Sequence, residues 1–157
     1  MTDTIIAQST PPGQSALAMI RISGPLCEEI AKDALALPSP TPRVSHLRNY
    51  RSLDYETILD QVIVVLYPIG KSFTGETTLE ISCHGNTFIV RKIIEDLLKR
   101  GCRTAKPGEF TKRAFLSGRI DLTQAESIAE LISAKSDAEL KIANLNLSGA
   151  QGNAYKS

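Results

Sequence analysis

The chain has 157 residues and a mass of 17.0 kDa, the size of one ordinary domain with a short extension. Hydrophobic residues make up 42% of it and charged residues 22%, which excludes a disordered or fibrous protein, and no apolar run reaches the roughly 18 residues of a membrane span. The formal net charge of +1 excludes a strongly basic or acidic protein, and the N-terminus lacks a secretory signal, so we expect a cytoplasmic protein that does not associate with membranes.

Two strands joined by a turn are predicted at the start of the chain. Residues 4–8 and 15–22 are mostly apolar, and the residues between them, 10–13, are of the turn-forming kind. Pro25 is tolerated at the first position of a helix, and apolar residues then recur at helical spacing until the proline-rich stretch 38–42. We therefore predict a helix between these two points.

Three further strands are predicted in the middle of the chain, over residues 44–51, 61–67 and 77–83. The second is apolar enough to lie at the centre of a sheet. The third alternates apolar with polar side chains, as a half-buried strand does.

A helix, a short strand and a small helix follow. Asn86 suits an N-cap and Gly101 a C-terminal stop, so we predict a helix between them. Its buried stripe is expected to consist of Phe88, Ile89, Ile93, Ile94, Leu97 and Leu98. A short strand near 102–105 then leads into a helix that Gly118 closes. Hairpin-connected strands with segregated helices favour an α+β fold over a doubly wound α/β sheet.

From residue 121 onward the sequence predicts one long helix that reaches residue 148. Thr123 and Glu126 have the spacing of a capping box. Apolar residues then recur at near-heptad spacing, interrupted by Lys135 at one expected position: Ile128, Leu131, Ala138, Ile142 and Leu145. Such a helix either folds back on the first domain or belongs to a helical region outside this chain.

Basic residues concentrate in one segment. Residues 91–119 carry nine basic and three acidic groups, whereas residues 1–90 have a net charge of −3 and residues 120–157 one of −2. Such a block either binds phosphate or carboxylate groups or is the solvated face of a helix. For Arg91, Lys92, Lys99 and Arg100 we favour the solvated face.

The cysteines indicate free thiols rather than a disulfide framework or a metal site. Cys27, Cys83 and Cys102 form no CxxC pair, and their number is odd. Cys83 and His84 are adjacent, so on a strand they point to opposite faces and make poor joint ligands. We predict no metal site and no catalytic residue, and for His84 a turn position bonded to backbone.

Arg21 and Glu80 are the charged side chains that most need an explanation. Arg21 follows Leu17 and Met19 in one row of a predicted strand, and Glu80 lies on a strand among mostly buried neighbours. A buried guanidinium or carboxylate needs a partner. Two explanations stay open: an ion pair between the two without function, or a polar, partly dry pocket that binds a ligand with complementary donors and acceptors.

Four stretches of the chain together resemble one family. They are DTIIAQSTPPGQSALAMIRISGP (3–25), SFTGETTLEISCHGN (72–86), KPGEFTKRAFLSGRIDLTQAE (106–126) and ELISAKSDAELKIANLNLSG (130–149). In order and spacing they resemble the N-terminal region of the bacterial and organellar tRNA-modification GTPases, the MnmE or TrmE family. The resemblance covers nearly the whole chain and is far more specific than one short motif.

This resemblance implies an α+β fold similar to the tetrahydrofolate-binding domain of the glycine-cleavage aminomethyltransferase. It implies a folate-binding and dimerisation domain over residues 1–119, followed over 120–157 by the first helix of a helical domain. It also implies a homodimer that binds a one-carbon carrier of the 5-formyl-tetrahydrofolate type.

In complete family members, a Ras-like GTP-binding domain interrupts the helical domain, and potassium and magnesium assist GTP hydrolysis. With an FAD-dependent partner protein, the complete enzyme is expected to add an aminomethyl-type (carboxymethylaminomethyl) group to the wobble uridine of tRNA. This sequence includes neither the GTP-binding domain nor the cysteine-bearing C-terminal segment. We therefore expect a truncated chain that alone neither hydrolyses GTP nor modifies tRNA.

Carried over by position, the folate site of the family falls on Arg21, Glu80 and Arg119. A pterin presents an exocyclic amine and a ring N–H side by side, and one carboxylate can accept both hydrogen bonds, which suits Glu80. The two arginines suit the ring carbonyl, the formyl oxygen or the glutamate tail, and which arginine holds which group stays open.

Two other functions are considered beside this one. The first is a pure dimerisation module, in which Arg21 and Glu80 are structural and the truncated form has no ligand site. The second is a free-standing aminomethyltransferase-like enzyme, against which the missing catalytic and nucleotide-binding segments argue. Two stretches depart from the family pattern: Gly85-Asn86 stands in place of a glycine pair, and residues 149–157 in place of a continuing helix.

Overall fold

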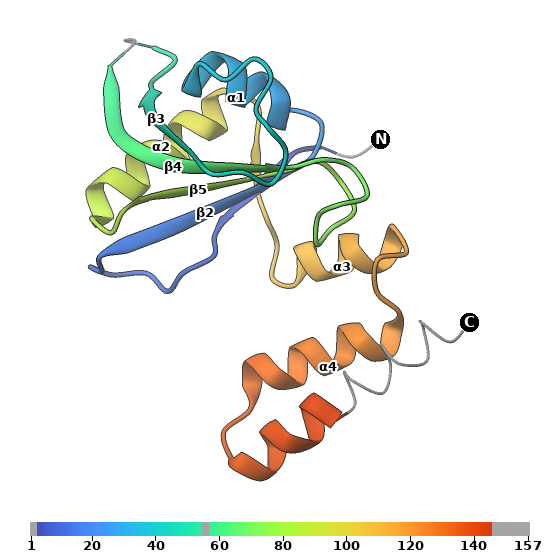
Figure 1. The fold of residues 1–157 in the computed structure, drawn as a ribbon. Coiled ribbons are helices and arrows are strands. Elements are labelled where there is room, and N and C mark those ends of the chain that lie inside the picture. Colours follow the sequence, from blue (N-terminus) through green and yellow to red (C-terminus); the bar gives the residue numbers. More distant parts are fainter. Residues whose placement is uncertain (1–2, 55–56, 146–157) are drawn as a thin grey trace.

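A six-stranded sheet forms the centre of the molecule in the computed structural model, which describes residues 3–54 and 57–145 (Figure 1). The strands are β1 (Ile5–Gln8), β2 (Leu17–Ser23), β3 (His46–Arg51), β4 (Ile58–Tyr67), β5 (Thr78–His84) and β6 (Arg103–Thr104). Their order in the sheet is β3-β4-β5-β2-β1-β6. Neighbours pair antiparallel except β1 and β6, which are parallel. Each strand expected from the sequence is present, and the mixed α and β architecture is confirmed.

Helices lie on both sides of this sheet. Helices α1 (Cys27–Leu35) and α2 (Thr87–Lys99) cover one face, which we call the first face. Helix α3 (Glu109–Leu116) lies on the opposite, second face, where Phe110 contacts Arg21 of β2. Helix α4 (Leu122–Ser133) extends away from the sheet beyond α3 (Figure 1). Among the described residues, none of the helices combines the length and the hydropathy that a membrane span requires.

The core fills the space between the first face and the helices α1 and α2. Because strand side chains alternate, every second residue of β2 and β5 points into it. These residues, with their helical partners, are at most 2% exposed: Ala18, Ile20, Ile22, Leu79, Ile81, Cys83, Ile30, Ala34, Ile93 and Leu97. The three cysteines are free, as expected, and all three are buried.

Helix α2 begins where the sequence predicts it. The Asn86 side chain accepts hydrogen bonds from the backbone N–H groups of Phe88 and Ile89, at 2.8 and 3.2 Å. The predicted buried stripe is partly wrong, because Phe88 is 57% and Leu98 40% exposed. Ile93 and Leu97 are buried as predicted, and Val90, which the prediction left out, shares their side of the helix at 3.6 residues per turn.

The single long helix predicted for the C-terminal region is wrong. Helix α4 ends at Ser133, because Ala134 has extended backbone angles, and a second helical segment spans residues 137–145 in the opposite direction (Figure 1). The Ser136 side chain caps this segment by accepting from the Glu139 N–H at 3.1 Å. The start was also misplaced, since Asp121 is the N-cap of α4 and Gln124 completes its capping box. Residues 146–148 of the predicted helix lie outside the described residues.

Candidate functional site

The second face of the sheet carries polar side chains beside α3. Strand alternation places Met19 and Arg21 of β2 on this face, and the antiparallel register puts Arg21 opposite Glu80 and Met19 opposite Ser82 of β5. Residues opposite one another on antiparallel strands point to the same side. Two charged residues far apart in the sequence therefore meet because of the β2–β5 register.

Arg21 and Glu80 form an ion pair. The Arg21 Nε and Nη2 groups both donate to Oε2 of Glu80, at 3.3 and 3.0 Å. The two side chains are 30% and 15% exposed, so the carboxylate is the drier partner. The ion pair expected under the first explanation of these residues is thus present. Binding of a ligand by the same pair stays a prediction.

Two aromatic side chains border this ion pair, and neither was predicted as a site residue. Tyr67 at the end of β4 hydrogen-bonds to Glu80, and its pKa is raised by burial first and by this bond second. Phe110 of α3 lies with its ring centroid 5.9 Å from Cζ of Arg21. The strand alternation that places Val65 opposite Glu80 also puts Tyr67 on this face. No local pattern signals Phe110, because its contact depends on where α3 packs.

Arg119 is placed differently. Within the described part of the chain, its guanidinium bonds to the β4–β5 loop rather than to Arg21 or Glu80, with Nη1 donating to the Gly70 carbonyl at 3.1 Å. Its side chain also lies against Gly75 of the same loop. The structure therefore brings together two of the three predicted site residues and attaches the third to a neighbouring loop.

A network of ion pairs fixes α3 beside the site. Arg113, whose side chain is 8% exposed, donates to Asp3 at 2.8 Å and to Glu76 at 3.0 Å. Arg103 of β6 bonds both to Asp3 and, at 2.6 Å, to Glu109 of α3. Hydrogen bonds from Arg103, the largest cause in each case, lower the pKa of Asp3 and that of Glu109 to about 2. The helix, the N-terminal segment, β6 and the β4–β5 loop are thereby joined.

Much of the positive charge of residues 91–119 is paired with carboxylates of the same chain. The solvated face predicted for α2 is wrong for Arg100, whose side chain is 8% exposed and lies 2.7 Å from Asp96. Burial is the largest single influence on the Arg100 pKa and lowers it. Pairing with Asp96 stabilises the charged guanidinium and acts in the opposite direction, and the net result is a raised pKa for Arg100. Arg91 and Lys99 are exposed, as expected.

His84 does not occupy the predicted turn position. It is the last residue of β5, and its Nδ1 lies 2.9 Å from Oδ1 of Asp60, whose other oxygen accepts the His84 backbone N–H at 2.8 Å. The side chain thus bonds to a carboxylate rather than to backbone. Within the described residues, no group of three or more histidine, cysteine or acidic side chains is arranged to hold a metal ion.

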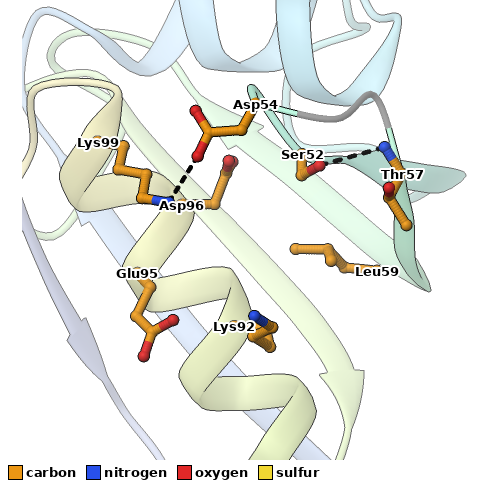
Figure 2. A pocket seen from close by; sticks show the side chains of 8 residues that line it. All are labelled: Ser52, Asp54, Thr57, Leu59, Lys92, Glu95, Asp96 and Lys99. Atoms are coloured by element: carbon orange, nitrogen blue, oxygen red, sulfur yellow. Dashed lines mark hydrogen bonds and ion pairs between the residues drawn. The ribbon is translucent and has the colours of Figure 1, made fainter.

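A cavity of about 230 Å³ lies elsewhere, between α2 and the connection from β3 to β4 (Figure 2). It contains none of the predicted site residues, and is lined by Ser52, Asp54, Thr57, Leu59, Lys92, Glu95, Asp96 and Lys99. Its carboxylates already have partners: Asp54 bonds to Lys99 at 2.6 Å, and Asp96 accepts from the Tyr50 hydroxyl at 2.7 Å. The second face beside α3, rather than this cavity, is therefore the candidate site.

Comparison with known proteins gives one consistent result. The family model described as the GTP-binding protein TrmE N-terminus matches residues 4–119. Proteins named tRNA modification GTPase MnmE are 50% identical over 152 residues in Opitutus terrae, 46% over 154 in Cytophaga hutchinsonii and 44% over 147 in Thermotoga maritima. These matches cover 97%, 94% and 94% of this chain but 33%, 32% and 32% of the relatives. The chain thus spans about a third of the length of the curated relatives it matches.

Proposed function

The chain belongs to the family of the TrmE N-terminus, and from that premise we propose that it is the N-terminal part of a tRNA-modification GTPase. In this proposal it binds a reduced folate of the 5-formyl-tetrahydrofolate type and pairs with a second copy of itself in the cytoplasm. The complete enzyme, with GTP, potassium, magnesium and an FAD-dependent partner, would add the carboxymethylaminomethyl-type group to the wobble uridine of tRNA. The one-carbon chemistry belongs to the folate, and this chain would bind and orient it.

The observation that carries the folate proposal is the Arg21–Glu80 pair beside α3. Both hydrogen bonds from Arg21 go to Oε2 of Glu80, and Tyr67 also hydrogen-bonds to this carboxylate, so a ligand with two N–H donors would take the place of these partners. A carboxylate that is 15% exposed gains most from a ligand with two adjacent N–H donors, because few waters compete for it. A pterin has these two donors on one edge of a flat ring. Phe110 and Tyr67 border the same place and suit a flat ring.

Arg119 has a separate role in this proposal. Its position is exposed, and its guanidinium is attached to the β4–β5 loop at Gly70. Such a position suits the charged glutamate tail of a folate, which stays partly in water, better than the pterin ring. The division of the chain into residues 1–119 and 120–157 stays a prediction.

The second face also supports the proposed pairing of two chains. Leu17 of β2, Leu47 of β3 and Ile63 of β4 are 54%, 57% and 42% exposed. Strand alternation and register place all three on the face that α1 and α2 do not cover. Apolar side chains gathered on one exposed sheet face are typical of a protein–protein interface.

Two measurements on the chain test the proposed function. Isothermal titration with 5-formyl-tetrahydrofolate should show saturable binding, and sedimentation equilibrium should show a dimer. A dimer that gives no binding heat and no retention of folate in equilibrium dialysis would support the dimerisation module instead. A monomer that binds folate would show that the second face is not an interface between two copies of the chain.

A further inference from the structure

We propose that Phe110 of α3 is a positioning residue of the ligand site, which holds the Arg21 guanidinium in place when a ligand occupies the Glu80 carboxylate. The inference rests on the proposed function, since it concerns how the same site receives its ligand. Phe110 belongs to helix α3, whereas Arg21 and Glu80 lie on strands β2 and β5.

Arg21 has two partners of different kinds. Glu80 accepts its hydrogen bonds at 3.0 and 3.3 Å, and the guanidinium also lies over the Phe110 ring, with Cζ 5.9 Å from the ring centroid. A ligand whose N–H donors bind Glu80 competes with Arg21 for the carboxylate. A partly buried guanidinium that loses its carboxylate is costly unless another partner remains.

An aromatic ring is a partner that does not compete with the ligand. The attraction between a cation and the face of a ring needs no hydrogen-bond acceptor. A guanidinium held over a ring keeps its N–H donors at its edges, where an oxygen of the ligand can accept from them. Phe110 would thus keep Arg21 in the site, with its donors directed at the ligand, after Glu80 has changed partners.

The position of Phe110 is fixed by its own helix. Glu109, the preceding residue, is bound to Arg103 at 2.6 Å, and Arg113, three residues later, is bound to Asp3 and to Glu76 at 2.8 and 3.0 Å. Charge-assisted bonds on both sides of Phe110 thus attach α3 to β6, to the N-terminal segment and to the β4–β5 loop. The ring is therefore held at its site before any ligand arrives, and binding does not have to order it.

Isothermal titration of the full chain with 5-formyl-tetrahydrofolate tests this role. Phe110→Leu keeps an apolar side chain but removes the ring, and we expect the dissociation constant to rise on the order of fivefold. Phe110→Tyr keeps the ring face and should bind within about twofold of the unmodified chain. Phe115→Leu is the matched control, because Phe115 lies on the same helix and is 40% exposed, and it should also stay within about twofold.

A double-mutant cycle separates positioning from packing. If Phe110 acts through Arg21, Phe110→Leu should change the dissociation constant less than about twofold in an Arg21→Gln chain. Thermal unfolding of each variant shows whether it is folded, and the Phe110→Tyr result stands even if Phe110→Leu does not fold.

Equal affinity of the Phe110→Leu and unmodified chains, or a fivefold loss in Phe110→Tyr, would overturn the inference while leaving the proposed function intact. An undiminished effect of Phe110→Leu in the Arg21→Gln chain would do the same. A failure of the unmodified chain to bind folate would overturn the proposed function and this inference with it.

Discussion

Arg113 of α3 and Glu76 of the β4–β5 loop form an ion pair of 3.0 Å that is nearly closed to solvent, with side chains 8% and 19% exposed. Glu76 also accepts from the Ser23 hydroxyl at 2.9 Å, at the end of the strand that carries Arg21. The pair joins two of the motif-bearing stretches, residues 72–86 and 106–126. It thereby connects α3 to the β4–β5 loop.

Loss of this pair should destabilise the chain. Arg113→Met removes the cation but leaves Glu76 mostly buried, and we expect the free energy of unfolding to fall by about 2–4 kcal/mol. Arg91→Met is the control, because Arg91 is 64% exposed and lies 3.8 Å from Glu95, and it should change that energy by less than about 0.5 kcal/mol. Urea unfolding followed by circular dichroism measures both. Equal losses in the two variants would show that the network does not hold α3.

Acid should weaken the same network. The pKa values of Asp3 and Glu109 are lowered from 3.8 and 4.5 to about 2, chiefly by hydrogen bonds from Arg103. Both carboxyl groups therefore bind protons more readily in the unfolded chain than in the folded one. Their contribution to stability is complete at a pH above their ordinary pKa values of 3.8 and 4.5, and it is lost as the pH falls towards 2.

Urea midpoints at pH 6 and pH 3 test this expectation. The unmodified chain should lose more stability between these pH values than a chain that carries Asp3→Asn and Glu109→Gln, because the latter cannot titrate at these positions. The same pH dependence in both chains would contradict the assignment.

The β4–β5 loop needs a glycine at position 75, where it packs against the C-terminal end of α3. Gly75 has a φ of +83°, and a Cβ there would collide with the Ser117 side chain. Gly70 has a similar φ of +79° but open space around it. Gly75→Ala should therefore destabilise the chain by about 1–3 kcal/mol more than Gly70→Ala, which introduces backbone strain alone. Thermal unfolding compares them, and equal melting temperatures would show that the loop does not pack on α3 as described.

Local signals were sufficient to place the sheet strands and the start of α2. Alternation located β5, and the Asn86 side chain was recognised as an N-cap. The break at Ala134 was also encoded, since Ser136 and Glu139 have capping-box spacing. The near-heptad apolar pattern led to the wrong prediction because it continues across the break.

The site depended on information that no local pattern contains. Arg21 and Glu80 are 59 residues apart, and their pairing follows from the β2–β5 register. From the residue types alone, an ion pair was only one of two explanations for these charged side chains. Phe110 could not be assigned, because its place depends on the ion pairs of Arg113 and Glu109 with residues of other elements. The attachment of Arg119 to Gly70 likewise depends on how the loop folds against α3.

Isothermal titration of the Glu80→Gln chain with 5-formyl-tetrahydrofolate, beside the unmodified chain and a Glu95→Gln control, tests whether the Arg21–Glu80 pair is a folate site. Glutamine keeps the shape of the side chain but presents one acceptor and one donor, so an adjacent pair of ligand N–H groups loses a partner. We predict saturable binding by the unmodified and Glu95→Gln chains, and a loss of about 1–3 kcal/mol of binding free energy in Glu80→Gln. Unchanged affinity of the Glu80→Gln chain, or no binding by the unmodified one, would contradict the placement of a folate site at the Arg21–Glu80 pair.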